Sequence, residues 1–184
     1  AEAGVRVLAG HTDSLCALAW SPDDESLLTC GSDQTIKLWS VATAECVHTF
    51  RRHEESVTSV AWLPDGRAFV SAGADKLVRF WSLAKGEQVM QIEAHTAPVL
   101  SLAYKPDGTL LASGGADKEL KIWDTKTREQ KNLVTGHPGN VAAIAWPEKK
   151  AELITASDDG PARVVGSSRS CGGKRHRISP ALST

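Results

Sequence analysis

The chain has 184 residues, of which 41% are hydrophobic and 23% are charged, and its formal net charge is −1. These proportions are those of a folded globular domain and exclude a disordered polymer. Residues 1–165 hold 17 basic and 22 acidic groups, a net charge of −5, so this mildly acidic body gives no reason to expect nucleic acid as a main ligand. No apolar run is long enough to cross a bilayer, so a membrane is not predicted as a partner either.

One unit of 42 residues occurs four times without a slip in phase. A histidine opens each unit and an aspartate follows later in it. A tryptophan marks a third position in the first three units, whereas Val165 replaces it in the fourth. A fixed period of this size indicates a repeat architecture in which each unit is one small supersecondary block. The phased residues are His11, His53, His95 and His137; Asp33, Asp75, Asp117 and Asp159; and Trp39, Trp81 and Trp123.

Each unit continues with a short apolar run that ends in an aromatic residue, at residues 15–20, 57–62, 99–104 and 141–146. A run this apolar favours a β-strand that is buried on both faces. In the first three units the sequences SPDD, LPDG and KPDG follow, and proline followed by aspartate or glycine is typical of a tight turn. In the fourth unit Pro147 comes one position early, and a charged run at 148–150 replaces the turn.

Three further strands are predicted in a complete unit. The second strand lies at residues 26–30, 68–72, 110–114 and 152–156, and the turn with the phased aspartate follows it. The third alternates, with Ile36 and Leu38 on one face and Lys37 and Trp39 on the other. The fourth lies at residues 46–50, 88–92 and 130–134. Each complete unit is therefore predicted to be a four-stranded antiparallel meander without a helix.

A four-stranded sheet with two apolar faces is unstable alone in water, so each sheet must stack against copies of itself. Twisted sheets that stack side by side close radially into a β-propeller, which leaves only short edges. A β-sandwich is the main alternative, but it does not require a strict period. The predicted fold class is an all-β propeller built from four blade-length repeats.

The motifs of these units strongly resemble the WD40 repeat: they are GH at 10–11, GSDQTIKLW at 31–39 and IWD at 122–124. The resemblance covers residues 5–165. It implies four repeats at about 9–50, 51–92, 93–134 and 135–165, the last of them incomplete. In this family the outermost strand comes just before the GH of the next repeat. The resemblance therefore implies that Val5–Leu8 is the outer strand of a preceding blade.

Four repeats with one broken end predict a WD40-type propeller segment that forms an incomplete ring. Three alternatives stay open at this point. Val5–Leu8 could supply the missing outer strand and close a ring of four blades, two chains could associate through their open edges into a ring of eight, or the chain could be part of a longer propeller. The first residues lie within a strand-like segment, which favours a fragment or a processed product.

Each unit also carries a serine or threonine on its second strand. Out of context, His95, Ser113 and Asp117 could form a nucleophilic triad. An active site needs one triad, however, whereas this set recurs in every unit, so we predict no catalytic residue and no enzyme activity. The resemblance implies instead a hydrogen-bonded structural tetrad in each blade, in which buried polar groups satisfy one another. The predicted tetrads are His11, Thr29, Asp33 and Trp39; His53, Ser71, Asp75 and Trp81; His95, Ser113, Asp117 and Trp123; and, without a tryptophan, His137, Thr155 and Asp159.

The remaining reactive residues predict neither a metal site nor a cofactor. Histidines occur singly in the units, and no His/Cys cluster has ligand spacing. The run of residues 171–174, CGGK, lacks the spacing of a phosphate loop. The four cysteines are sparse and form no CxxC pair, which favours a reducing intracellular compartment, either the cytoplasm or the nucleus.

Partners of WD40 proteins often bind the top face of the propeller, around its central channel. By resemblance, this face takes the residues that flank the start of each first strand and the residue before each phased aspartate. Most of them are small and neutral, so a plain rim with contacts elsewhere is the alternative. The charged loop at 51–55 would suit an acidic peptide, or it is a solvated turn. The candidate partner-binding residues are Ser14, Cys16, Ser32, Arg51, Arg52, Ser56, Thr58, Leu100, Asn140 and Asp158.

The repeat ends at Val165. Residues 166–184 are rich in serine, glycine and basic residues, and we predict either a disordered tail or the product of a shift in reading frame. Alternatively, the basic cluster at 174–177, KRHR, would serve nuclear import or bind anions.

The sequence predicts a non-catalytic scaffold that mediates protein–protein interactions within a multiprotein complex, with proteins or peptides as partners. Narrower alternatives are a scaffold or substrate receptor of a ubiquitin-ligase assembly, a propeller of small-subunit ribosome processing, and a regulatory fragment of a longer chain with a catalytic domain elsewhere. Residues 124–126, DTK, resemble the box by which some WD40 proteins dock to cullin-4 ligases. That box has arginine at the position of Lys126, and lysine lacks its bidentate fork.

Overall fold

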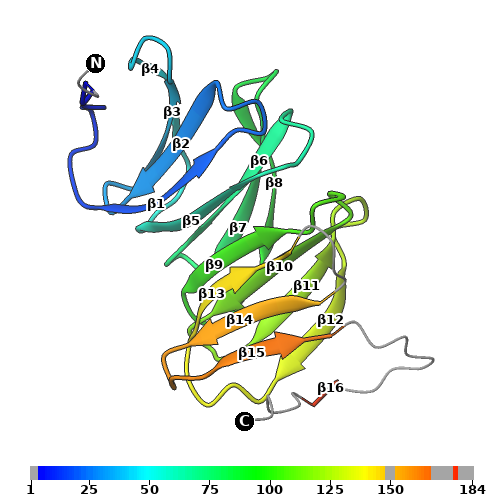
Figure 1. The fold of residues 1–184 in the computed structure, drawn as a ribbon. Helices are drawn as coiled ribbons and strands as arrows, with labels where there is room; N and C mark the ends of the chain where they lie inside the picture. The colour runs from blue at the N-terminus through cyan, green and yellow to red at the C-terminus, as the bar shows by residue number, and fades with distance from the viewer. Residues whose placement is uncertain (1–3, 148–151, 167–175, 178–184) are drawn as a thin grey trace.

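The structure, a computed structural model, describes residues 4–147, 152–166 and 176–177, and these residues form sixteen β-strands in four sheets (Figure 1). We call the sheets the first to fourth blades. The first blade holds β1 (Leu15–Trp20), β2 (Ser26–Gly31), β3 (Thr35–Ser40) and β4 (Cys46–Arg51); the second holds β5 (Val57–Trp62), β6 (Ala68–Gly73), β7 (Leu77–Ser82) and β8 (Glu87–Glu93); the third holds β9 (Val99–Tyr104), β10 (Leu110–Gly115), β11 (Leu120–Asp124) and β12 (Gln130–Thr135); and the fourth holds β13 (Val141–Ala145), β14 (Leu153–Ser157) and β15 (Ala162–Val165).

Within each blade, consecutive strands pair antiparallel in chain order, as the meander predicts. A two-residue strand, β16 (His176–Arg177), pairs parallel with β12 at the outer edge of the third blade. The predicted all-β propeller class is confirmed. In the described part of the chain, no helix is long and apolar enough to cross a membrane.

The turns between the strands repeat with the same backbone geometry. In the tight turn before each third strand, φ is 64° at Gln34, 68° at Lys76 and 66° at Lys118. These residues are spaced by one repeat, and the left-handed region is uncommon for residues other than glycine. In the fourth blade Gly160 occupies this phase with a φ of 109°. The turn conformation therefore belongs to the repeat and not to one residue type.

Consecutive blades pack with their first strands side by side, so that β1 contacts β5, β5 contacts β9 and β9 contacts β13. Figure 1 shows the blades following one another in an arc from the N-terminal blade to the C-terminal one. An apolar core fills the space between each pair of neighbours. Between the first two blades, the rings of Phe50 and Trp81 pack on Phe69, with centroids 4.9 Å and 5.7 Å from that of Phe69. Burial of these apolar surfaces is the main force that holds the blades together.

The two ends of the arc have no neighbouring blade in the described part of the chain. β1 exposes Leu15, Leu18 and Trp20, whereas the corresponding side chains of β5 are buried. The expectation that every first strand is buried on both faces is therefore wrong for β1, because one of the two covering layers must come from a preceding blade. It is also wrong for β13, where Ala142, Ala143 and Ala145 are exposed. At the other end of the arc, Ile154 and Val164 are exposed.

The segment Val5–Leu8 differs from the expectation that it is a strand. It has no strand conformation, the side chains of Val5 and Val7 are exposed, and a guanidinium nitrogen of Arg6 donates to the carbonyl of Ala42 in the first blade over 2.8 Å. Among the described residues, β15 is hydrogen-bonded on one side only, to β14. Val5–Leu8 therefore does not close a ring of four blades within one chain. The predicted disordered tail lies outside the described residues, apart from Gly166 and β16.

Candidate functional site

One end of every blade carries two turns that the backbone ties together. These are the loop before the first strand and the tight turn before the third strand. Ser32 N–H donates to the carbonyl of Ser14 over 2.9 Å, and Ala74 N–H donates to that of Ser56 over the same distance. The equivalent bonds from Ala116 to Pro98 and from Asp158 to Asn140 measure 2.9 and 3.3 Å. Because the first strands lie side by side, these ends form one surface, which we call the turn face.

Beneath the turn face, the tetrad side chains of the first three blades form continuous hydrogen-bonded chains. In the first blade, His11 Nδ1 lies 2.8 Å from Asp33 Oδ2, His11 Nε2 lies 2.7 Å from Thr29 Oγ1, and Trp39 Nε1 donates to the same hydroxyl over 2.7 Å. The three corresponding distances are 2.9, 2.7 and 2.8 Å in the second blade. In the third blade they are 2.9, 2.8 and 2.8 Å. The structure thus brings the residues of these three predicted tetrads together.

In the second and third tetrads, the hydrogen-bond partners of the histidine define how the protons are distributed. An ionised carboxylate only accepts, so Nδ1 carries the proton and donates to the aspartate. The hydroxyl accepts the indole N–H and donates its own proton to Nε2, which leaves the imidazole neutral. The hydroxyls of Ser71, Ser113 and Thr155 belong to side chains that are fully buried. They cannot reach a substrate, so the arrangement is unsuited to nucleophilic catalysis.

The electrostatics of the tetrads favour this distribution. Burial lowers the pKa of His53 and His95, although each faces an aspartate that favours the charged ring. Burial also disfavours the charged forms of Asp33 and Asp75, but hydrogen bonds from their neighbours outweigh it and lower the pKa of each carboxyl to about 2. The second and third tetrads therefore combine a neutral imidazole with an ionised carboxylate near neutral pH.

A basic residue accompanies each tetrad at a position that the sequence reasoning missed. Arg79 is buried, forms an ion pair with Asp75 and places NH1 2.8 Å from His53 Nδ1. Lys37 instead donates to Thr49 Oγ1 over 3.0 Å. The signal that would have found these residues is the same 42-residue spacing on each third strand. The set is Lys37, Arg79, Lys121 and Arg163.

The fourth tetrad is rearranged. Arg163 pairs with Asp159, with NH1 2.9 Å from Oδ1 and NH2 2.5 Å from Oδ2, and the same NH1 lies 3.4 Å from His137 Nδ1. The distance from His137 Nε2 to Thr155 Oγ1 is 3.3 Å. Burial and the Arg163 charge lower the pKa of His137. Here an Arg–Asp pair takes the place of the His–Asp hydrogen bond of the other blades.

Two sequence departures account for this rearrangement. A Cβ added to Gly115 would lie 2.6 Å from both Asp117 Oδ1 and His95 Nδ1, which leaves no room for a side chain next to the His–Asp bond. Gly73 is as crowded, 2.7 Å from His53 Nδ1, but the fourth blade has Ser157 at this phase. The second departure is Val165, which supplies no indole N–H.

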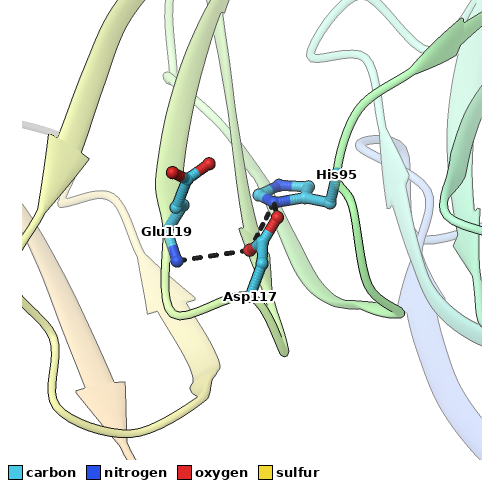
Figure 2. Close-up of side chains that lie close together, drawn as sticks. All are labelled: His95, Asp117 and Glu119. Atoms are coloured by element: carbon cyan, nitrogen blue, oxygen red, sulfur yellow. Dashed lines mark hydrogen bonds and ion pairs between the residues drawn. The ribbon is translucent and has the colours of Figure 1, made fainter.

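Close to the third tetrad, His95, Asp117 and Glu119 bring potential ligand atoms within 4.8 Å of one another (Figure 2). The contacts within this group are those of the tetrad. Both Asp117 oxygens lie within 3.0 Å of His95 Nδ1, the backbone N–H of Glu119 donates to Asp117 over 3.2 Å, and Lys121 pairs with the Glu119 carboxylate over 3.2 Å. A metal ion would have to break these contacts, so the group is better suited to holding the turn than to binding a metal.

The candidate partner-binding residues are distributed along the turn face. Ser14, Cys16 and Asp158 are exposed. Thr58, in contrast, uses its hydroxyl between blades, where it donates to the carbonyl of Val99 in the third blade over 2.5 Å. That hydroxyl is unavailable to a partner. Four further candidates are half-buried: they are Ser32, Ser56, Leu100 and Asn140.

The charged loop of the second blade lies at the edge of this face. Arg51 ends β4 and Arg52 follows it, and both side chains are exposed. Arg52 and Glu54 line a polar hollow of about 480 Å³, together with Asp75, Arg79 and Gln88. With two basic and two acidic side chains, the hollow as a whole carries balanced charge, and Arg52 is the exposed cation on its rim.

Comparisons with known proteins agree with this architecture. The family model described as "WD domain, G-beta repeat" matches residues 4–40, 44–82 and 86–124. A solved structure of U3-55K superposes with a TM-score of 0.82 at 28% sequence identity, covering 86% of this chain and 50% of that one. The likeness therefore extends over most of the arc of blades.

Two curated proteins show likeness over single repeats. The WD repeat-containing protein 26 homolog of Arabidopsis thaliana is 42% identical over 45 residues, which is 24% of this chain and 8% of that protein. A ribosome biogenesis protein BOP1 homolog of Aedes aegypti is 42% identical over 43 residues, which is 23% of this chain and 5% of that protein. The chain therefore matches only a small part of these relatives and half of the U3-55K chain.

Proposed function

Because the chain belongs to the WD40 repeat family, we propose that it is a non-catalytic scaffold whose turn face binds protein or peptide partners in a multiprotein assembly. WD40 propellers are typically interaction scaffolds. The observation that carries the proposal is that two sets of hydrogen bonds hold the turn face in place. Backbone bonds join loop to turn in every blade, and three tetrads anchor these turns from below. A rim held in this way loses little conformational entropy when a partner binds.

The most favourable contact point on this face is Arg52. It is an exposed cation next to a hollow, and guanidinium groups bind carboxylates through charge-assisted hydrogen bonds. We propose a partner segment that carries at least one carboxylate. An intracellular setting, cytoplasmic or nuclear, belongs to the same proposal, and the free thiols of Cys16, Cys30 and Cys46 are consistent with it.

The test compares two arginines of the second blade. Arg52 lies on the turn face. Arg67 lies in the β5–β6 turn at the opposite end of the blade, and its side chain is also exposed. Immobilised wild-type chain, Arg52→Glu and Arg67→Glu are incubated with cell extract, and retained proteins are quantified by mass spectrometry. We expect one set of proteins to be lost with Arg52→Glu and kept with Arg67→Glu. Identical profiles for the three chains would contradict binding at this point of the turn face.

A ribosome-biogenesis assembly is a second candidate, favoured by the likeness to the BOP1 homolog. Co-sedimentation of the tagged chain with pre-ribosomal particles in a sucrose gradient would support it, and sedimentation with free protein would argue against it. The ubiquitin-ligase alternative has weaker support, because the carboxylate of Asp124 already accepts from the N–H groups of Lys126 and Thr127 and pairs with Lys131. A regulatory role within a longer chain also remains a proposal.

A further inference from the structure

The large exposed apolar side chains at the two ends of the arc occupy repeat positions that are buried between neighbouring blades elsewhere in the chain. Leu18 on β1 is 61% exposed. One repeat later, Val60 is 6% exposed because it packs on the preceding blade. Leu15 and Trp20 differ from the buried Val57 and Trp62 in the same way. We call Leu15, Leu18 and Trp20 the leading face.

The other end shows the complementary half. Ile154 on β14 is 43% exposed, whereas its counterparts Leu28, Val70 and Ala112 are fully buried against the next blade. Val164 on β15 is exposed, and its counterpart Ile122 is buried. We call Ile154 and Val164, with the small exposed side chains of Ala156 and Ala162 between them, the trailing face.

Three interfaces within the chain show how a leading face packs on a trailing face. Between the first and second blades, Leu28, Cys30 and Ile36 on the trailing side pack on Val57, Val60 and Trp62 on the leading side. The indole N–H of Trp62 also donates to the carbonyl of Ala19 across this interface, over 3.0 Å. Trp20 lies one repeat before Trp62, and Ala145 lies three repeats after Ala19. In a contact between two molecules, the equivalent bond would therefore run from Trp20 of one molecule to the carbonyl of Ala145 of the other.

The outer strand follows the same logic. Residues 4–9 are in phase with β4, β8 and β12, but they pair with no sheet in the structure. Leu8 corresponds to Phe50 and Val134, which lie in the cores between blades. Among the described residues, the fourth blade has three strands, and β15 pairs only with β14. The described part of the chain thus has a segment in the phase of an outer strand at one end, and at the other end a sheet to which no described outer strand is paired.

We propose that two copies of this chain associate, the leading face of each on the trailing face of the other, and that residues 4–9 of each copy extend the fourth blade of its partner along β15. The two contacts are identical and related by a two-fold axis, so the assembly closes. Together the copies form a ring of about eight blades, which lies within the range of natural propellers. This pairing goes beyond the scaffold function and does not depend on the turn face.

The experiment measures the molar mass of the 184-residue chain by size-exclusion chromatography with light scattering, across a range of concentrations. The variants are Leu18→Glu on the leading face and Ile154→Glu on the trailing face. The matched control is Val47→Glu, because Val47 is also 61% exposed but lies on the outer strand β4. We expect twice the monomer mass of 19.6 kDa for the wild type and Val47→Glu, and the monomer mass for the two face variants.

A mixing experiment distinguishes this specific pairing from nonspecific association. Each face variant alone damages both contacts of its homodimer. A one-to-one mixture of Leu18→Glu and Ile154→Glu has one damaged contact and one intact contact per heterodimer. We therefore expect the mixture to recover part of the dimer, and recovery also shows that both variants are folded.

Three outcomes would overturn the proposal. A wild-type monomer at all concentrations would mean that other blades, not a second copy, cover these faces. A ladder of larger species would mean that the contact does not close. Equal loss of the dimer in Val47→Glu and Leu18→Glu would mean that the association does not use the leading face.

Discussion

The hydrogen-bond partners of the tetrad histidine His53 favour one chemical state of its ring. Its two ring nitrogens have different partners, a carboxylate at Nδ1 and a hydroxyl at Nε2. A second ring proton would meet a hydroxyl that already accepts from the tryptophan indole. Protonation therefore costs a hydrogen bond in addition to the burial of a charge.

Replacing Asp75 by alanine tests how much one tetrad contributes to stability. The change leaves His53 without its acceptor and the buried Arg79 without its counter-charge. Because breaking a buried pair leaves an uncompensated charge, we expect the free energy of unfolding to fall by about 3 kcal/mol. Urea denaturation measures it. Glu54→Ala removes a neighbouring exposed carboxylate and should change stability by less than about 0.5 kcal/mol. Equal effects of the two substitutions would contradict the structural role of the tetrad.

The pH dependence of stability follows from the lowered pKa values. His53, His95 and His137 have folded-state pKa values below their ordinary 6.5. Below pH 6.5 the unfolded chain therefore binds more protons than the folded one, and the free energy of unfolding decreases as the pH falls. The contribution of the histidines is complete above pH 6.5. Asp33 and Asp75, with pKa values lowered from 3.8 to about 2, add a second loss between these values.

Urea midpoints measured from about pH 8 to pH 5 report the first of these losses. The comparison variant is His95→Gln, which removes one of these three histidines and should reduce the change of the midpoint across this range. A midpoint independent of pH in this window would show that the tetrad histidines do not favour the neutral form.

The tetrad residues could be predicted from the sequence because each of them recurs at the same position of every repeat, and equivalent positions have equivalent surroundings. The basic residue at Arg79 has the same phase relation, but its role depends on where a long side chain turns, and Lys37 turns elsewhere. The effect of Ser157 also required coordinates. The change from glycine is visible in the sequence, but the distance between a Cβ and the histidine ring is not.

Among the elements, the fourth blade is the least regular. Val165 stands at the phase of the tetrad tryptophan and lines a cavity of about 200 Å³ between the third and fourth blades. Leu110, Ile122 and Trp146 line the same cavity. The blade therefore combines a rearranged tetrad with a poorly filled interface, and Val165 contributes to both.

Restoring the repeat residues in this blade should stabilise the chain. The double variant Ser157→Gly and Val165→Trp removes the obstructing Cβ, fills the cavity and provides an indole donor for Thr155. Cavity filling commonly contributes about 0.5–2 kcal/mol, and we expect a gain in this range by thermal or urea denaturation. Val165→Phe in the same background fills space without an N–H donor. The tetrad interpretation requires the tryptophan variant to be the more stable of the two.

Strand positions were largely predictable because turn residues and the alternation of apolar side chains recur in every unit. Burial was predictable only where a neighbouring blade exists. β1 and β5 have the same pattern, yet only β5 has blades on both sides. In the same way, Val5–Leu8 has the pattern of an outer strand, but a strand forms only when an adjacent edge supplies hydrogen-bond partners. Local pattern determines what a segment can form, and the neighbouring blades determine whether it forms.

At the scale of the whole molecule, stability accumulates interface by interface, as in other repeat proteins, because each blade contacts mainly its neighbours. The two end blades have one neighbour each in the described part of the chain, so they are the places where unfolding is expected to begin. A ring closed by a second copy would give every blade two neighbours and remove both ends.

Trp20 gives the chain an intrinsic optical reporter of this state. It lies exposed on the leading face, whereas Trp39 and Trp81 are almost fully buried. In the free chain, iodide should quench the fluorescence of Trp20 most strongly and leave the buried indoles bright. Trp20→Phe should therefore remove most of the quenchable fraction, and the half-buried Trp146 accounts for the rest. Raising the protein concentration should shield Trp20 and shift its emission toward the blue in the wild type, but not in Ile154→Glu. Quenching that does not change over that range of concentration would show that this indole stays in water. Because Trp20 is intrinsic to the chain, closure of the eight-blade ring can be followed by fluorescence without an added label.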